Sequence, residues 1–82
     1  MICRYSTNAI CKCPVDGALD VYGVEITAPV MLKVEDINDA LAGLRDKTMF
    51  QEDLTSSLAK ALGATVKTTG THSGVYTEVS AP

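Results

Sequence analysis

The chain has 82 residues, of which 46% are hydrophobic and 21% charged, with a formal net charge of −3. This size and composition are typical of one small folded domain and exclude extensive disorder. The scattered Lys and Arg residues do not indicate a surface that follows nucleic-acid phosphates. The longest apolar run, residues 28–32, is too short to cross a membrane, and residues 1–6 lack the pattern of a secretory signal. We therefore expect no membrane association and a cytoplasmic location.

Residues 1–17 show no clear periodicity, so we predict an irregular N-terminal arm. Apolar and polar residues alternate from Leu19 to Ala28, which predicts a half-buried strand. Pro29 interrupts this pattern, and residues 30–34 fit a second strand. Together these two segments predict a first hairpin.

The period then becomes helical. Apolar side chains at helical spacing are Val34, Ile37, Leu41 and Leu44. With acids early and bases late, they predict a first helix of about three turns. Thr48 with Gln51 three residues later fits a capping box for a second helix. Its expected buried stripe is Leu54, Leu58, Ala61 and Leu62, and Gly63 is placed to end it.

Residues 64–69 and 75–79 alternate with β-branched side chains and predict a second hairpin, connected by residues 70–74. The element order β-β-α-α-β-β predicts an α+β fold, an antiparallel sheet with both helices on one face. The uncovered face and the sheet edges predict a homo-oligomer, a ring or barrel of subunits.

Cys13 and Asp20 stand seven positions apart around a turn that contains Pro14 and Gly17. Such a turn can fold back so that the thiol and the carboxylate meet. A thiol needs a nearby proton acceptor to become a nucleophile, and a carboxylate can take that role. The alternative is a solvent-facing turn beside a buried cysteine.

The start of the second helix is another candidate. There the exposed backbone N–H groups stabilise the Glu52 carboxylate, which suits hydrogen bonding to the N–H edge of a guanine-like ring. The alternative is an ordinary solvated helix acid, as we expect for Asp53. Gln51 has its own explanation as the capping partner of Thr48.

The remaining polar candidates have simpler explanations. His72 lies between two glycines and fits an acid, a base, a ligand or an exposed loop residue. Tyr22 is most simply a cross-strand packing residue, and Thr68 belongs to a solvated strand face. Cys11, Cys13 and His72 offer three zinc ligands, but no fourth is evident, so we predict no metal site. The three cysteines lie in the first sixth of the chain, which does not fit a disulfide framework.

Two segments resemble a known family. Cys-Pro-Val-Asp-Gly-Ala-Leu-Asp at 13–20 resembles the active-site segment of the 7-cyano-7-deazaguanine (preQ0) nitrile reductases, Cys-Pro-hydrophobic-Thr-Gly-x-x-Asp. Phe-Gln-Glu-Asp at 50–53 resembles that family's Phe-His-Glu-Asp, whose glutamate anchors the base. Residues 51–55 and 70–75 are more distantly similar to GTP cyclohydrolase I. The resemblance implies one tunnelling-fold (T-fold) domain over residues 1–82, assembled into multi-subunit barrels with sites between subunits.

The departures from the family narrow the expected chemistry. The reductases carry a Ser- and Lys-containing NADPH segment where this chain has residues 34–39. Gln51 replaces the family's histidine, and Gly74 stands where the cyclohydrolase has its second zinc cysteine. The resemblance therefore implies a short form without NADPH or metal, similar to the amidinotransferases that convert a deazaguanine nitrile to an amidine.

In this reading Cys13 forms a thioimide with the nitrile, Asp20 moves the proton, and Glu52, Gln51 and His72 bind the substrate. The deazaguanine is either a small molecule or carried by a nucleic acid. Alternatives are an NADPH-dependent nitrile reductase of queuosine synthesis, a non-catalytic purine- or pterin-binding module, and a structural oligomer.

Overall fold

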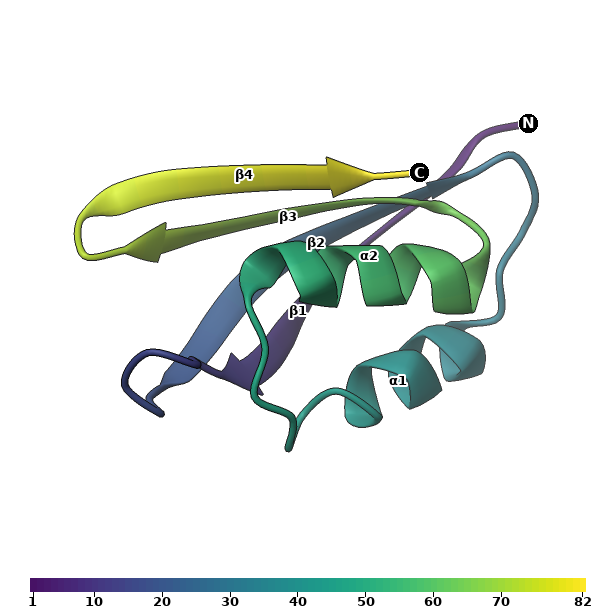
Figure 1. The fold of residues 1–82 in the computed structure, drawn as a ribbon. Coiled ribbons are helices and arrows are strands. Elements are labelled where there is room, and N and C mark those ends of the chain that lie inside the picture. Colours follow the sequence, from purple (N-terminus) through teal and green to yellow (C-terminus); the bar gives the residue numbers. More distant parts are fainter.

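The computed structural model describes residues 1–82 and shows a four-stranded antiparallel sheet with two helices on one face (Figure 1). The elements are β1 (Cys3–Lys12), β2 (Leu19–Ala28), α1 (Val34–Ala42), α2 (Gln51–Leu62), β3 (Thr65–His72) and β4 (Val75–Ala81). The strands lie in the order β1-β2-β3-β4. The predicted α+β class and the β-β-α-α-β-β order are confirmed.

The first hairpin differs from the prediction. β1 pairs with β2 along its whole length, from Cys3 opposite Ala28 to Lys12 opposite Leu19. The predicted irregular arm is therefore wrong over residues 3–12, and the predicted strand at 30–34 is wrong because α1 begins at Val34. The helix-facing side of β1 includes small buried residues such as Ala9 and Cys11, so hydropathy alternates too weakly to reveal a strand.

The segment between β2 and α1 forms no strand and is fixed by hydrogen bonds to the Tyr5 side chain. The Leu32 N–H donates to the Tyr5 hydroxyl at 2.8 Å, and that hydroxyl lies 3.4 Å from the Leu32 carbonyl. Val30 and Met31 are exposed, so this apolar run is not a buried strand.

The alternation predicted for β2 is confirmed. Tyr22, Val24 and Ile26 are buried beneath the helices, while Val21 and Glu25 are exposed on the opposite face. β2 pairs with β3 over residues 23–27 and 65–69, and β3 pairs with β4 out to the tight turn after His72. The strands of this second hairpin are longer than predicted, so His72 ends a strand.

The helices cover the sheet and complete the core. α2 buries Leu54, Leu58 and Ala59, and Gly63 ends it in the left-handed conformation (φ 60°), as predicted. Ala61, however, is exposed. α1 is shorter than predicted and ends at Ala42, so no basic residue lies in its last turn.

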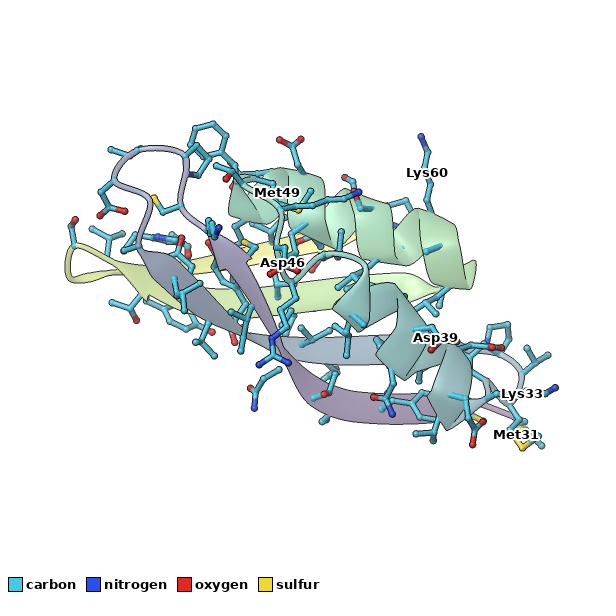
Figure 2. The ribbon with its side chains drawn as sticks, turned by 90° about the horizontal axis from the view of Figure 1, so that it is seen from below. Met31, Lys33, Asp39, Asp46, Met49 and Lys60 are labelled. Carbon is cyan, nitrogen blue, oxygen red and sulfur yellow. The ribbon has the colours of Figure 1, made fainter.

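The outer surface of the helical layer carries charge. Figure 2 looks onto this layer, where Lys33, Asp39 and Lys60 are exposed. Neither helix has the length and apolar character needed to span a membrane.

The predicted capping box is wrong. Phe50 is the N-cap residue of α2 and makes no side-chain cap hydrogen bond. Gln51, 3% exposed, instead directs its amide toward β3 and β4. This places the start of α2 against the end of the sheet.

Candidate functional site

A pocket of about 240 Å³ is lined by residues of the β1–β2 turn, the start of α2 and the β3–β4 hairpin. These three segments lie at the same end of the sheet (Figure 1). The lining of the pocket is Cys13, Pro14, Val15, Asp20, Tyr22, Phe50, Gln51, Glu52, His72 and Thr77. All five residues that the sequence singled out as site candidates therefore line one pocket. Its volume is below the range for drug-sized ligands, so it suits a smaller molecule.

Backbone hydrogen bonds fix the turn that carries Cys13. The Cys13 N–H donates to the Ala18 carbonyl at 2.8 Å, and the Gly17 N–H donates to the Cys13 carbonyl at 2.9 Å. Gly17 has φ 74°, a conformation that favours glycine. The turn thus folds back and brings Cys13 and Asp20 to the same pocket.

The segment before α2 is tied to the same turn. The Lys12 N–H donates to the Lys47 carbonyl at 2.9 Å, and the Met49 N–H donates to the Lys12 carbonyl at 3.1 Å. These bonds join the end of β1 to the segment that precedes α2. They hold Phe50 and Glu52 near Cys13, although the two residues lie nearly forty positions further along the chain.

A second carboxylate, Asp16, lies in the Cys13 turn. It accepts the Ala18 N–H at 2.9 Å, and this bond is the main reason that the pKa of Asp16 lies below its ordinary value. Hydrogen bonding with the Cys13 thiol lowers the pKa of Asp16 further. Asp16 stands where the resembling reductase segment has threonine, and no role beyond the turn is predicted for it from the sequence.

A chain of hydrogen bonds runs along the pocket wall from Asp20. The Tyr22 hydroxyl donates to Asp20 Oδ2 at 3.2 Å and lies 3.3 Å from His72 Nε2. The same His72 nitrogen lies 3.3 Å from Gln51 Oε1. Tyr22 is only 1% exposed, and its pKa is raised well above 10.0, first by burial and then by the neighbouring Asp20 charge.

The Gln51 amide is fully used by the protein. Its Nε2 donates to the Thr68 carbonyl and hydroxyl at 3.2 and 3.1 Å and to the Thr77 carbonyl at 3.4 Å. Its Oε1 accepts from the Thr77 hydroxyl at 2.6 Å and contacts His72. The Thr55 hydroxyl donates to the Gln51 carbonyl and meets the Thr68 hydroxyl at 2.7 Å. Gln51 thus belongs to the wall of the pocket and ties α2 to two strands.

Glu52 is the free carboxylate at the rim. It is exposed in the first turn of α2, where the unpaired backbone N–H groups of the helix start favour negative charge. Phe50, 52% exposed, and Val15, 82% exposed, provide apolar surface beside it. A planar ring with N–H groups along one edge fits this combination of apolar contact and acceptor oxygens.

Cys11 stays outside the pocket. Its buried thiol lies 3.6 Å from the Met49 carbonyl, and burial is the main reason that the pKa of this thiol is raised. Cys11, Cys13 and His72 do not form a group that could hold a metal ion.

Sequence reasoning missed several site residues. Tyr22 was assigned to packing and Thr68 to a solvated face, yet Thr68 is 0% exposed and bonded to Gln51. One signal was available for Tyr22, because it follows Asp20 by two positions and so shares its face of the strand. No local signal marks Thr68 and Thr77, whose partner lies on another element.

Neither protein-family models nor curated proteins match the chain. Among solved structures, it is similar to a crystal structure described as the archaeosine synthase QueF-Like in the apo form. The TM-score is 0.85, the sequence identity is 21%, and the match covers 98% of this chain and 90% of that chain. This likeness shows that the chain adopts the tunnelling fold.

Proposed function

We propose that this chain is an enzyme that acts on a 7-cyano-7-deazaguanine group and converts its nitrile to an amidine. The observation that carries the proposal is that Cys13, Asp20 and Glu52 all line one small pocket. The fold agrees, because the similar solved structure is described as an archaeosine synthase. Seven of the ten residues that line this pocket belong to the two segments that resemble the nitrile reductases.

The proposed reaction begins with Cys13. Its thiol proton passes to the Asp20 carboxylate, and the sulfur attacks the nitrile carbon. A C–S bond forms, the C≡N bond becomes C=N, and Asp20 returns the proton to the nitrogen, which gives a neutral thioimide. Ammonia or another amine then attacks the same carbon. The C–S bond breaks, the sulfur regains a proton from the amine, and the amidine leaves.

Glu52 would bind the heterocycle. Its carboxylate oxygens accept hydrogen bonds from the amino group and a ring N–H, while the ring lies against Phe50. Hydrogen bonds to a charged acceptor are each worth about 1.5–3 kcal/mol, so Glu52 contributes strongly to affinity. Gln51 and His72 complete the substrate-facing wall.

The assembly and the substrate's carrier form part of the proposal. The unpaired edges of β1 and β4 favour a homo-oligomeric barrel with the pocket completed at a subunit boundary, in the cytoplasm. The exposed rim formed by Val15 and Phe50 allows the deazaguanine to arrive as a free base or within a nucleic acid.

Intact-mass spectrometry after incubation with the free nitrile tests the proposal. We expect one adduct per chain with the mass of the nitrile, lost in Cys13→Ala and retained in Cys11→Ala and Cys3→Ala. Absence of the adduct in the native protein, or its survival in Cys13→Ala, overturns the proposal. Consumption of NADPH on adding the nitrile would point to reduction instead. Binding that requires Glu52 but not Cys13 would point to a non-catalytic module.

A further inference from the structure

The hydrogen-bond chain behind the pocket has a defined direction. Gln51 Nε2 faces the Thr68 and Thr77 carbonyls, which only accept, so this end of the amide is the donor and Oε1 is an acceptor. The Tyr22 hydroxyl gives its proton to Asp20 Oδ2. His72 Nε2 is therefore placed between two acceptors, Tyr22 Oη and Gln51 Oε1, each at 3.3 Å.

This arrangement assigns the proton on the imidazole. A nitrogen between two acceptors must donate, so His72 carries a hydrogen on Nε2. Its hydrogen bond to Tyr22 continues through the tyrosine hydroxyl to Asp20. The tilted Tyr22 and His72 rings, with centroids 5.5 Å apart, keep the two groups adjacent. Asp20 and His72 are thus joined through one buried hydroxyl.

We propose that Tyr22 and Gln51 are positioning residues that couple Asp20 to His72, so that the carboxylate and the imidazole act as one proton relay. The catalytic part of this inference rests on the proposed function, whereas the coupling itself is a property of the folded chain. It gives Gln51 an indirect role, which differs from the direct substrate contact that the sequence suggested.

The relay balances protons without any other reactant. When the Asp20 carboxyl protonates the nitrile nitrogen, the Tyr22 hydroxyl proton moves to Asp20 Oδ2. When His72 carries a proton on both ring nitrogens, its Nε2 proton moves to Tyr22 Oη, and the imidazole keeps its other proton on Nδ1. Tyr22 is neutral before and after the transfer, in agreement with a buried phenol whose pKa is raised. The reverse transfer recharges His72 when the amine loses its proton.

The pocket limits the groups that influence His72. Asp20 and Tyr22 face it from β2, Glu52 from the start of α2, and Cys13 from the β1–β2 turn, while β4 contributes only the neutral Thr77. A change in the Nε2–H signal of His72 can therefore be assigned to one of these groups by comparing variants at these few positions.

NMR of the imidazole tests the coupling without substrate. His72 is the only histidine, so ¹⁵N-histidine labelling reports on one ring. We expect a resolved Nε2–H proton signal, protected from solvent exchange, that is lost in Tyr22→Phe and in Gln51→Leu. Tyr5→Phe is the matched control, because it removes another tyrosine hydroxyl, bonded to Leu32, away from the pocket. Unchanged Nε2–H protection in Tyr22→Phe overturns the coupling.

Steady-state kinetics tests the catalytic part. Tyr22→Phe keeps the aromatic ring, so we expect turnover to fall by about 10²-fold, at the low end for acid–base catalysis, with little change in KM and an altered pH profile. Tyr5→Phe should leave all three unchanged. An active native protein with full turnover in Tyr22→Phe overturns the relay. Lack of any adduct in the native protein overturns the proposed function instead, and the NMR result still decides the coupling.

Discussion

Replacing Gln51 by leucine tests how the start of α2 is held to the sheet. Leucine has a similar size, so the substitution removes the amide with little change in packing volume. The structure leaves no buried side-chain polar atom without a partner. After the substitution, the Thr77 hydroxyl loses its 2.6 Å acceptor, and the Thr68 hydroxyl and carbonyl lose a donor.

The expected cost follows from the number of hydrogen bonds lost, since the Thr68 and Thr77 hydroxyls each keep one partner, the Thr55 hydroxyl and the Gly70 carbonyl. Each lost hydrogen bond costs about 0.5–1.5 kcal/mol, and the added apolar surface of leucine offsets part of that cost. Because Thr68 is 0% exposed, water does not replace its lost donor. We expect the free energy of unfolding to fall by about 2–4 kcal/mol, out of roughly 4–12 kcal/mol for a chain of this length.

Urea denaturation followed by circular dichroism measures this change. Ser56→Leu on the exposed face of the same helix is the control, and we expect it to stay within about 0.5 kcal/mol of the native protein. A Gln51→Leu variant as stable as Ser56→Leu would show that the amide network does not fasten α2 to β3 and β4.

Three further outcomes are expected. Gly70→Ala should destabilise the protein by about 1–3 kcal/mol in thermal melts, because the new Cβ would come 2.7 Å from the Tyr22 ring; an unchanged melting temperature would contradict this packing. The folded-state pKa of the Tyr22 phenol is raised above 10.0, so this phenol loses its proton more readily in the unfolded chain, and rising pH therefore favours unfolding. Tyr22→Phe removes this effect and should make the free energy of unfolding fall less steeply between about pH 9 and about pH 11. Urea midpoints across that range measure this, and equal slopes in the two proteins would refute it. Glu52→Gln should weaken nitrile binding by about 10-fold or more by calorimetry, whereas Asp53→Asn, outside the pocket, should not.

Periodic burial made most of the fold predictable. The alternation in β2 and the helical spacing of Leu54 and Leu58 come from large apolar side chains, which mark one face clearly. Gly63 ended α2 as predicted because the left-handed conformation favours glycine. β1 escaped prediction because small residues such as Ala9 cover its buried side.

The site was predictable only in part, because its contacts are long-range. The turn that brings Cys13 and Asp20 to one pocket could be predicted, because Pro14 and Gly17 are neighbours of these residues in the sequence. Gln51 was misread as a helix cap because capping rules consider only neighbours, whereas its amide partners lie 17 and 26 residues away. Tyr22 was assigned to packing for the same reason, since its link to His72 spans 50 residues.

The most direct measurement is ¹³C NMR of 7-cyano-7-deazaguanine labelled at the nitrile carbon and bound to the native protein. The carbon signal should move from the nitrile region to that of a carbon bonded to sulfur and doubly bonded to nitrogen. It should stay in the nitrile region with Cys13→Ala. A bound ligand whose carbon remains a nitrile in the native protein would contradict covalent capture by Cys13.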